Sequence, residues 1–459
     1  MLSRVAVVGL GKLGASMAAA FAARGYQVVG VDVNPDSVRL VNEGKAPVQE
    51  TDLARYIAEN RPRLRATTSH AEAVHDSDVS FVIVPTPSDV RGSFSLEYAA
   101  QAFTAIGRAL ADKDGYHLVT LTSTVLPGSM RHVLLPILER EAGKRAGRDF
   151  GVCYSPEFIA LGSVIADFLN PDFTLVGELD EQSGATLEAV YARALSNDPP
   201  CRRMSLENAE LAKVALNAFV TTKISFANML ADLCERLPGG DVDVVTAAIG
   251  TDSRIGVKYL RGALGFGGPC FPRDNVALAY VAGALGACAE LPETTGRTNG
   301  ARADAVATLV AAALPAGSMV AVLGLAYKPF SDVVEQSQGL RVAEMLAGAG
   351  LRVVACDPLA SAPAKSVVQG TIEMRDTPAE CLREADAVVV ATPDPAFAML
   401  DPALFASDSA SPRLVVDCWR LLRQPLEHLA GVRYVGVGLS SDDDANAARL
   451  AALWAPESH

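Results

Sequence analysis

The chain has 459 residues, of which 50% are hydrophobic and 20% are charged. This length exceeds the usual size of one domain and the composition supplies ample core, which excludes a disordered chain and a small disulfide-stabilised scaffold. With 40 Lys and Arg against 53 Asp and Glu, the net charge is −13, which disfavours general binding to nucleic acid or to an anionic membrane. A local basic cluster can still bind a small anionic substrate.

The eight cysteines form no C-x-x-C pair and lie scattered in apolar or helical sequence. This pattern favours free thiols in a reducing cytoplasm over a zinc site or a disulfide framework, so no metal is expected. The N-terminus becomes glycine-rich too early for a signal peptide. The uncharged stretch between Asp304 and Lys328 is interrupted by Pro315 and Gly317, so we interpret it as a helix end, a turn and a strand over 319–324, and predict no membrane span.

From Arg4 to about Pro200, short β-branched runs alternate with alanine-rich stretches. These runs are VAVVG, QVVGVD, VSFVIVP, HLVTLTS and TLVG. The alternation predicts a parallel sheet with helices on both faces. We therefore expect a Rossmann-like domain over residues 1–200.

Strands are expected to stop at Cys201, where helical patterning begins and continues to about Thr298. This predicts a helical middle domain over residues 201–300. After Pro315 the alternation resumes with MVAVLGLA, LRVVACD, ADAVVVATP and LVVDCW, which predicts a C-terminal domain over 301–459. The expected fold class is α/β, with two Rossmann-like, doubly wound parallel-sheet domains joined by the helical middle domain.

A glycine-rich turn follows the first predicted strand and opens a helix expected to begin at Leu13. Its residues are Gly9, Leu10, Gly11, Lys12, Leu13 and Gly14. The glycines allow a tight turn and close approach to a pyrophosphate at the helix N-terminus. The next strand ends in Asp32, at the distance expected for a carboxylate that binds a ribose diol, and no cation follows it to bind a 2′-phosphate. The pattern favours NAD over NADP; an ordinary strand–helix turn is the alternative.

The segment from Gly262 to Asp274 places Cys270 between a glycine run and an Arg–Asp pair. Glycines let the backbone approach a ligand closely, and the nearby Arg273, together with basic residues upstream, would favour a thiolate. Cys270 is thus a candidate nucleophile. By spacing alone, a small buried hydrophobic cysteine is the commoner interpretation.

From end to end, the chain resembles the UDP-glucose/GDP-mannose dehydrogenase family, with motifs matching in order in all three regions. These are the glycine turn with Asp32, Val84-Pro85-Thr86-Pro87, Ser123-Thr124-Val125, Ser155-Pro156-Glu157-Phe158, Glu210-Leu211-Ala212-Lys213 through Asn217-Ala218-Phe219, the Cys270 loop, and Gly324-Leu325-Ala326-Tyr327-Lys328-Pro329.

The resemblance implies oxidation of C6 of a nucleoside-diphosphate hexose, UDP-glucose foremost, to a carboxylate with two NAD consumed, as in polysaccharide biosynthesis. Cys270 would form a thiohemiacetal and then a thioester. Lys213 and Asn217, four apart on a predicted helix, would stabilise the oxyanion. Asp274 and Thr124 match positions that hold or activate water, and Glu157 matches the general base for thioester hydrolysis.

The resemblance also implies the binding residues. Thr86, Pro87, Thr124 and Arg273 would join the glycine turn and Asp32 in holding NAD. The sugar nucleotide would contact Phe158, Ile159, Leu161, Lys213, Asn217, Arg254, Lys258, Tyr259, Gly267 and Lys328. In the family the residue matching Arg254 can come from a neighbouring subunit, which implies a homodimer through the middle domain.

Four positions depart from the common family pattern. Leu161 stands where many members carry a second glutamate, Arg273 replaces a lysine, Pro269 replaces a serine, and Glu335 lies where an arginine often follows the Lys-Pro motif. These differences leave the chemistry intact but leave the base and the hexose open, with dTDP-glucose, GDP-mannose and UDP-N-acetylhexosamines as alternatives.

Two other functions remain as rivals on the sequence. A two-electron hydroxyacid or sugar-phosphate dehydrogenase would need neither a nucleophilic cysteine nor a second α/β domain. A non-catalytic regulator that binds NAD or a nucleotide sugar would have no need for Lys213, Asn217, Cys270 and Asp274 together.

Overall fold

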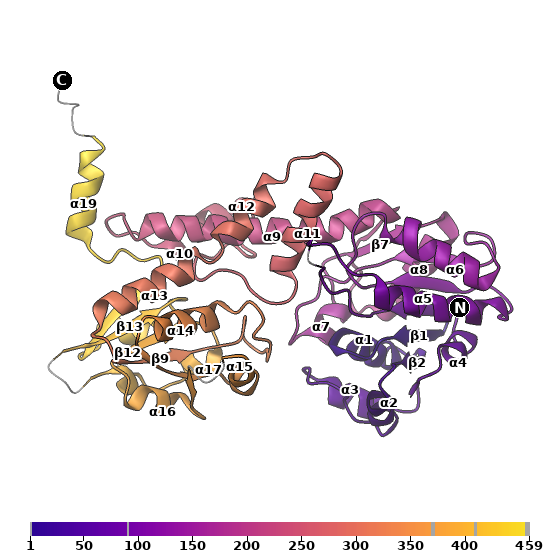
Figure 1. The fold of residues 1–459 in the computed structure, drawn as a ribbon, viewed down its shortest axis with the longest axis horizontal. Helices are drawn as coiled ribbons and strands as arrows, with labels where there is room; N and C mark the ends of the chain where they lie inside the picture. The colour runs from indigo at the N-terminus through magenta and orange to yellow at the C-terminus, as the bar shows by residue number, and fades with distance from the viewer. Residues whose placement is uncertain (1, 90, 369–371, 408–410, 455–459) are drawn as a thin grey trace. The chain divides into compact units, whose positions relative to one another are not determined.

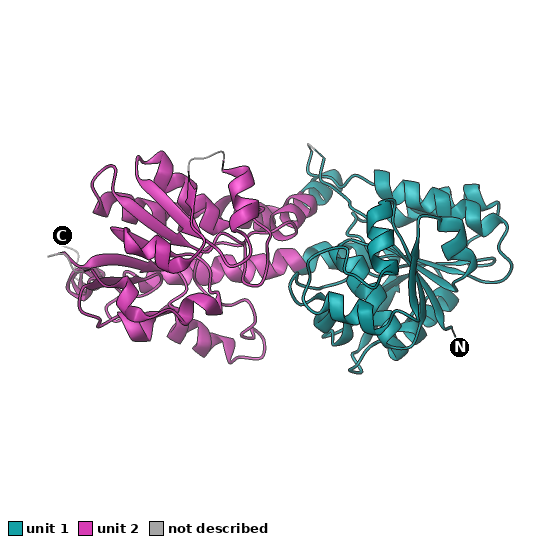
Figure 2. Ribbon diagram, turned by 90° about the horizontal axis from the view of Figure 1, so that it is seen from below, with its two compact units in different colours: residues 1–216, 280–287 teal, residues 217–279, 288–459 magenta. Residues whose placement is uncertain are grey.

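The computed structural model describes residues 2–89, 91–368, 372–407 and 411–454. The chain forms two compact units: unit 1 contains residues 1–216 and 280–287, and unit 2 contains residues 217–279 and 288–459 (Figure 2). Each unit is built around a sheet with helices on both faces (Figure 1).

The sheet of unit 1 has eight strands in the order β3-β2-β1-β4-β5-β6-β7-β8. All neighbours pair in parallel except β6 and β7, which are antiparallel. The order reverses between β1 and β4, which makes the carboxyl ends of these strands the expected ligand edge. The strands are β1 (Arg4–Val8), β2 (Gln27–Val31), β3 (Leu64–Thr67), β4 (Val79–Val82), β5 (Leu118–Leu121), β6 (Gly151–Tyr154), β7 (Thr174–Glu178) and β8 (Cys201–Ser205).

Successive residues of β1 point to opposite faces of this sheet, because side chains alternate along a strand. Val5 and Val7 join a core with the first helix, whereas Ala6 and Val8 join the core on the other face. The helices are α1 (Lys12–Ala23), α2 (Pro35–Asn42), α3 (Leu53–Glu59), α4 (His70–His75), α5 (Glu97–Ala111), η1 (Met130–Leu134), α6 (Leu135–Ala142), α7 (Val164–Leu169) and α8 (Glu181–Ala194).

The expectation that strands stop at Cys201 is wrong by one element, because β8 is a further strand of the first sheet. Its sequence, CRRMS, lacks the apolar run that marks a buried strand. β8 lies at the edge of the sheet, where Arg203 pairs with Glu178 at 2.7 Å and with Glu188 at 3.3 Å. A polar edge strand carries no periodic hydrophobic signal.

The helices that follow β8 confirm the expected helical middle region. They are α9 (Leu206–Cys234), α10 (Val242–Gly250), α11 (Phe271–Ala284) and α12 (Glu290–Thr298). Among the described helices, α9 alone is long and apolar enough to cross a membrane by length and composition. The same character is typical of the central helix of a globular protein, and α9 buries the polar side chains of Glu210, Lys213, Asn217 and Thr221.

The sheet of unit 2 has six parallel strands in the order β11-β10-β9-β12-β13-β14. The turn and strand predicted after the uncharged helix are confirmed by β9. The elements are α13 (Ala301–Ala313), β9 (Met319–Leu323), α14 (Gln338–Gly348), β10 (Arg352–Cys356), α15 (Ser361–Val367), β11 (Glu373–Met374), α16 (Pro378–Arg383), β12 (Ala387–Val390), α17 (Pro395–Ala398), η2 (Pro402–Phe405), β13 (Arg413–Asp417), α18 (Arg423–Leu426), β14 (Val432–Gly436) and α19 (Asp443–Ala452).

The predicted fold class is therefore confirmed, with one antiparallel strand pair added to the first sheet.

Candidate active site

The glycine turn lies between β1 and α1, at the point where the strand order of the first sheet reverses. Gly9 has a φ of +99°, which other residues rarely adopt. A Cβ at Gly14 would overlap the carbonyl oxygen of Gly9, so Gly14 keeps α1 close to β1. A Cβ at Gly11 would meet no atom within 4 Å. Gly11 therefore has no packing role within the chain and leaves space for a ligand at the helix N-terminus.

α1 begins at Lys12, one residue earlier than expected. Lys12 and Leu13 are half-buried in its first turn, while Gly11 is exposed.

Asp32 follows β2 and is half-buried beside this turn. Its Oδ2 accepts from the backbone N–H of Leu10 at 2.7 Å, and its Oδ1 accepts from that of Asn34 at 2.8 Å. These bonds fix the carboxylate while leaving acceptor capacity for a ribose diol. The open position at Gly11 and the oriented carboxylate at Asp32 fit a dinucleotide with a free 2′-hydroxyl.

Thr86, Pro87 and Thr124 follow β4 and β5, the next two strands along the same edge. The Thr86 hydroxyl donates to the backbone oxygen of Thr124 at 2.8 Å, which ties the two loops together. Thr86 is buried, Thr124 is half-buried and Pro87 is exposed.

Lys213 and Glu157 meet in unit 1. The Lys213 ammonium donates to the backbone oxygen of Glu157 at 2.7 Å and lies 4.7 Å from the centre of the Phe158 ring. Burial raises the pKa of Glu157 to about 8, although the Lys213 charge and a hydrogen bond from Tyr191 oppose the shift. A carboxyl group with such a pKa can exchange a proton near neutral pH, as a general base must. Ile159 and Leu161 are half-buried in the same loop.

Glu210 lies one turn before Lys213 on α9 and is completely buried. Its two carboxylate oxygens accept from the backbone N–H groups of Gly128 at 2.6 Å and Met130 at 2.8 Å. Burial raises the pKa of Glu210 to about 7, against these two bonds. The loop that carries Thr124 is thereby anchored to α9.

In unit 2, Cys270 is exposed and directly precedes α11. Its backbone oxygen accepts from the N–H of Asp274 at 2.8 Å, the first bond of that helix. α11 begins at Phe271, so Asp274 lies in its first turn and does not cap it. Cys270 therefore lies at the positively polarised end of α11, which favours an anion.

Asn217 and Asp274 are both buried and meet between α9 and α11, where the Asn217 amide donates to the Asp274 carboxylate at 2.6 Å. One turn further along α9, Thr221 and Asn275 form a second link at 2.9 Å. Half-buried Arg273 lies with its Nε 3.9 Å from the other oxygen of Asp274.

The glycine loop before Cys270 is fastened by amide side chains. Asn228 on α9 accepts from Ala263 N–H at 2.8 Å, and Asn299 accepts from Phe266 N–H at 2.8 Å. A Cβ at Gly267 would overlap the backbone oxygen of Gln336, so this loop packs closely on the segment that carries Lys328. Lys328 is half-buried there, with its ammonium 5.8 Å from the centre of the Tyr327 ring.

Three of the four departures from the family pattern, Pro269, Arg273 and Glu335, lie in or beside this loop. Glu335 is exposed and holds the loop through its backbone oxygen, which accepts from Gly268 N–H at 2.9 Å. Pro269 is half-buried next to Cys270.

The basic segment that contains Arg254, Lys258 and Tyr259 is exposed in unit 2. The Arg254 guanidinium pairs with Asp252 at 2.6 Å, and Lys223 donates to the backbone oxygens of Ile255 and Gly256. Tyr259 has a φ of +63°, which is uncommon for a residue other than glycine.

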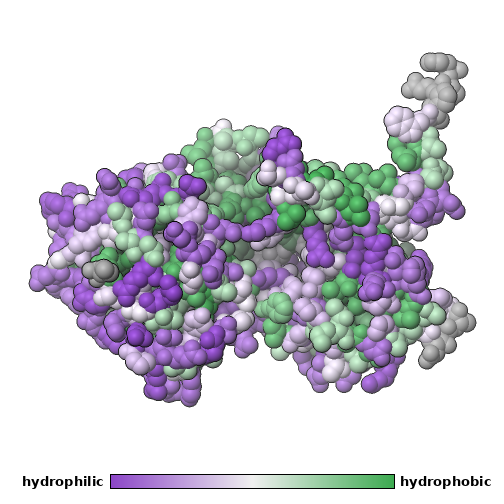
Figure 3. All heavy atoms as spheres, turned by 180° about the vertical axis from the view of Figure 1, so that it is seen from behind, coloured by the Kyte–Doolittle hydropathy of each residue, from purple (hydrophilic) through white to green (hydrophobic). Residues whose placement is uncertain are grey.

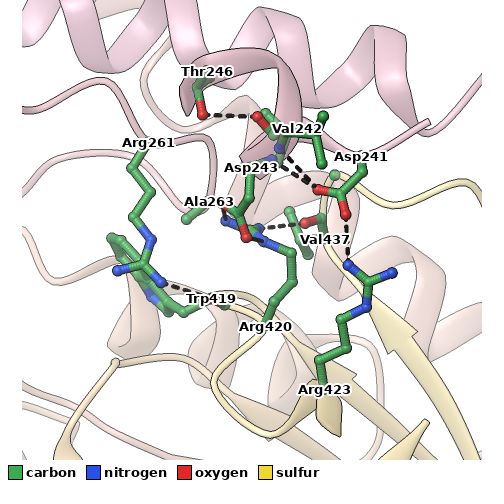
Figure 4. Close-up of polar contacts among 12 residues, drawn as sticks. Asp241, Val242, Asp243, Thr246, Arg261, Ala263, Trp419, Arg420, Arg423 and Val437 are labelled. Atoms are coloured by element: carbon green, nitrogen blue, oxygen red, sulfur yellow. Dashed lines mark hydrogen bonds and ion pairs between the residues drawn. The ribbon is translucent and has the colours of Figure 1, made fainter. Parts of the chain in front are cut away.

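The segments on either side are tied to the C-terminal sheet (Figure 4). Arg261 donates to the backbone oxygen of Trp419 at 3.3 Å. The Arg420 guanidinium donates to both carboxylate oxygens of Asp243, at 2.7 and 2.8 Å. Arg423 donates to Asp241, the residue that caps α10.

The predicted residues thus form two sets within the described chain. Unit 1 holds the glycine turn, Asp32, Thr86, Thr124, Glu157 and Lys213, and unit 2 holds Asn217, Cys270, Asp274, Arg254, Lys258 and Lys328. Sequence reasoning missed Tyr191, which donates to Glu157, and the pair Thr221 and Asn275, which bond to each other beside the Asn217–Asp274 contact. Asn275 is adjacent to Asp274 and Thr221 is one turn from Asn217, but Tyr191 lies in no motif.

Comparison with known proteins identifies the family of the chain. Three domain models of the UDP-glucose/GDP-mannose dehydrogenase family match: the NAD binding domain at residues 3–195, the central domain at 207–301 and the UDP binding domain at 321–424. The chain is 36% identical over 422 residues to UDP-glucose 6-dehydrogenase AglM of Haloferax volcanii, covering 91% of this chain and 97% of that protein.

Two further relatives span almost the whole chain. GDP-mannose 6-dehydrogenase of Azotobacter vinelandii is 34% identical over 428 residues, covering 90% of this chain and 96% of that one. The solved structure of a UDP-glucose dehydrogenase from Pyrobaculum islandicum matches with a TM-score of 0.86 at 34% identity, covering 96% of this chain and 98% of that chain. With its NAD-binding domain matched and relatives of this identity along its length, the chain belongs to the UDP-glucose/GDP-mannose dehydrogenase family of NAD-dependent nucleotide-sugar 6-dehydrogenases.

Proposed function

We propose that this enzyme oxidises the C6 hydroxymethyl group of a nucleoside-diphosphate hexose, UDP-glucose foremost, to the uronate. The observation that carries this proposal is the position of Cys270 at the N-terminus of α11, one turn before the buried Asp274–Asn217 pair. A thiol so placed suits covalent catalysis, because the helix end favours its thiolate and the following turn presents polar groups.

The overall reaction removes four electrons, so two NAD accept one hydride each. The first oxidation gives an aldehyde, and attack by the Cys270 sulfur on the aldehyde carbon forms a thiohemiacetal. The second oxidation gives a thioester, and water cleaves its carbon–sulfur bond, so that the uronate leaves and the thiol is restored. Bound NAD supplies the hydride-accepting chemistry, and the chain supplies the nucleophile and the groups that orient the substrate.

The polar residues of the proposed site have separate roles in the reaction. The Lys213 ammonium and the Asn217 amide would donate hydrogen bonds to the oxygen that becomes negatively charged in each step. Asp274 would hold water near the reacting carbon together with Thr124. Glu157, with its pKa raised to about 8, would accept the proton of the water that attacks the thioester.

The sugar nucleotide is proposed from the C-terminal domain and from the relatives. Residues 321–424 match a UDP binding domain, while relatives of similar identity are named for UDP-glucose and for GDP-mannose. UDP-glucose is therefore the first substrate to test. The basic residues Arg254 and Lys258 would bind the diphosphate, since guanidinium groups bind phosphate oxygens in pairs.

We also propose that two copies of the chain associate through α9. Within unit 2, this helix exposes Phe219, Phe226, Met229 and Leu233, the first of them 67% exposed. The spacing of seven, three and four residues places these side chains on one face. Figure 3 shows hydrophobic side chains gathered along the upper part of that view, over the helical region. A large exposed apolar face is typical of a protein–protein interface.

Purified enzyme incubated with NAD and a panel of UDP-, dTDP- and GDP-hexoses tests this function. We expect two NADH per uronate formed, with UDP-glucose the best substrate. One NADH per sugar would indicate a two-electron dehydrogenase, and binding without turnover would indicate a regulator.

The cysteine assignment has a matched control in the same assay. Cys270→Ser should stop net uronate formation while sugar nucleotide and NAD still bind, because a serine hydroxyl cannot form the thioester. Cys288, the other exposed cysteine among the described residues, lies outside the proposed site, and Cys288→Ser should keep wild-type activity. Uronate production by Cys270→Ser at the wild-type rate would exclude the covalent mechanism.

A further inference from the structure

We infer that Tyr191 is a positioning residue for Glu157: together with Ser155, it forms a hydroxyl pair that supports both protonation states of that carboxyl group. The inference rests on the proposed function, in which Glu157 accepts a proton during thioester hydrolysis. Neither Tyr191 nor Ser155 has a role in the mechanism described so far, and all three residues belong to unit 1.

Tyr191 reaches Glu157 from α8, a helix that contributes no other candidate to the site. Its ring is buried against Phe81 with the ring centres 6.1 Å apart, and the residue is 3% exposed. The hydroxyl lies 2.8 Å from the Ser155 Oγ and 3.4 Å from the Glu157 Oε1. Ser155 is also buried, and its Oγ donates to the backbone oxygen of Leu175 at 2.9 Å.

The protons of Glu157, Tyr191 and Ser155 can be arranged in two ways along this series of contacts. When Glu157 is protonated, it can donate to Tyr191, Tyr191 to Ser155, and Ser155 to Leu175, so that every hydroxyl proton has an acceptor. When Glu157 is ionised, Tyr191 turns its proton to the carboxylate, and Ser155 keeps its bond to Leu175. Between the two forms the Glu157–Tyr191 bond reverses and the Tyr191–Ser155 bond is lost, and in each form every hydroxyl proton has an acceptor without movement of the backbone.

Burial and the Glu157 carboxylate keep Tyr191 itself from titrating in this range. Burial and the nearby carboxylate raise the pKa of Tyr191 well above its ordinary value, and the thiol of Cys153 on β6 acts in the same direction. Tyr191 thus stays protonated at working pH. The other charge that faces Glu157 is Lys213 on α9, which lowers the pKa of Glu157, as does the hydrogen bond from Tyr191. Burial outweighs both.

Removal of the Tyr191 hydroxyl should therefore act on Glu157 in one direction. The ionised carboxylate loses a donor, so its pKa rises further. Below the midpoint, the fraction of Glu157 able to accept a proton falls about tenfold for each unit that its pKa rises. The step that suffers is thioester hydrolysis, whereas formation of the thioester does not require this base.

The experiment compares Tyr191→Phe with wild-type enzyme in three measurements: the pH dependence of kcat, the rapid first release of NADH, and the mass of the acyl-enzyme. We expect the acidic limb of the kcat profile to move up by roughly one pH unit. The KM for the sugar nucleotide and the first release of NADH should stay near wild type, and acyl-enzyme should accumulate at pH 7.

Tyr26→Phe is the matched control, because the Tyr26 hydroxyl is also buried and donates at 2.9 Å to the backbone oxygen of Val190, the residue before Tyr191 on α8. It removes a buried hydroxyl that holds the same helix, while the Tyr191–Glu157 contact stays intact. It should leave the pH profile unchanged. Ser155→Ala is a second test, which holds even where Tyr191→Phe folds poorly. Because Ser155 accepts from Tyr191 only when Glu157 is protonated, this substitution should move the acidic limb to lower pH, by less than Tyr191→Phe moves it up.

Wild-type enzyme and Glu157→Gln separate this inference from the proposed function. Two NADH per sugar from wild type and acyl-enzyme accumulation in Glu157→Gln establish the reaction and its base. If those hold and the profile of Tyr191→Phe matches that of wild type, the role of Tyr191 is refuted. If Glu157→Gln accumulates no acyl-enzyme, the proposed base itself is wrong.

Discussion

At the residue scale, the three glycines of the first turn are required for different reasons. Gly9 provides a backbone conformation with positive φ, and Gly14 allows α1 to pack on the turn. Gly11 meets nothing in the chain. Because Gly14 serves packing and Gly11 leaves room for the cofactor, folding and cofactor binding can be separated by substitution at these two positions.

We expect Gly11→Ala to fold with a stability within about 1 kcal/mol of wild type and to bind NAD at least tenfold more weakly, because its methyl group enters the space left for the pyrophosphate. Gly14→Ala should instead lose about 3 kcal/mol or more, since its Cβ overlaps the backbone of Gly9. Thermal unfolding and calorimetric titration with NAD check both. Unchanged NAD affinity in Gly11→Ala would contradict the proposed cofactor position.

Asp32 and Asp357 differ in how many acceptor positions they leave for a ribose, in agreement with the match of only the N-terminal domain to an NAD-binding model. Asp357 ends β10 as Asp32 ends β2, but its carboxylate accepts from four backbone N–H groups, those of Leu325, Ala326, Leu359 and Ala360. A carboxylate has about four acceptor sites, so Asp357 has none to spare for a ribose. Asp32 uses two.

At the scale of elements, the link between α9 and α11 determines how Asn217 and Asp274 meet. The Thr221–Asn275 hydrogen bond is completely buried and lies one turn along α9 from the Asn217–Asp274 hydrogen bond. Two hydrogen bonds fix both the spacing and the rotation of α11 relative to α9, whereas one hydrogen bond would leave the rotation free. Asn275 also donates to the backbone oxygen of Phe271, the first residue after Cys270 in the chain.

Thr221→Val should lower the thermal midpoint and cost about 1 to 2 kcal/mol, because the buried Asn275 amide loses a partner. We expect kcat to fall severalfold with little change in KM, since Asp274 is displaced while the binding residues remain. Thr222→Val is the control: Thr222 makes the same bond to the Ala218 backbone oxygen but is not linked to α11 by any bond in the described structure. Equal effects of the two substitutions would show that the Thr221–Asn275 hydrogen bond does not position Asp274.

Some strands and site residues could be predicted from the sequence, and others could not. Nine strands carry apolar runs and were predicted: β1, β2, β4, β5, β7, β9, β10, β12 and β13. The strands β3, β8, β11 and β14 were missed because they are short or polar, and β6 because its sequence, GVCY, contains a single β-branched residue. The site was predicted as far as motifs extend. Tyr191 could not be, since its contact with Glu157 spans 34 residues of sequence and depends on how α8 packs.

At the scale of the whole molecule, the proposed chemistry draws on both units. The cofactor turn, Glu157 and Lys213 belong to unit 1, while Cys270, Asn217 and Asp274 belong to unit 2. α9 runs through the boundary between Leu216 and Asn217 without a break, so the two halves of the proposed oxyanion site are one turn apart on one helix. We expect assembly through the proposed interface on the same helix to influence this site.

Arg254 offers a way to test that coupling. Its side chain is 87% exposed and pairs only with Asp252 among the described residues, two positions away in its own loop. If Arg254 binds the diphosphate held by the partner copy, the active sites are complete only in the dimer. Arg254→Ala should then raise KM strongly while leaving Cys270 reactive toward a thiol reagent.

Mixing Arg254→Ala with Cys270→Ser gives the decisive measurement. In a mixed dimer, one of the two sites combines the intact Cys270 of one chain with the intact Arg254 of the other. Random exchange makes about half of the dimers mixed, so we expect about a quarter of wild-type activity to return at saturating protein concentration. Arg148→Ala, which removes a comparable exposed Arg–Asp pair in unit 1, should keep full activity alone. If exchange of subunits is demonstrated and no activity returns, Arg254 serves its own chain or has no part in binding.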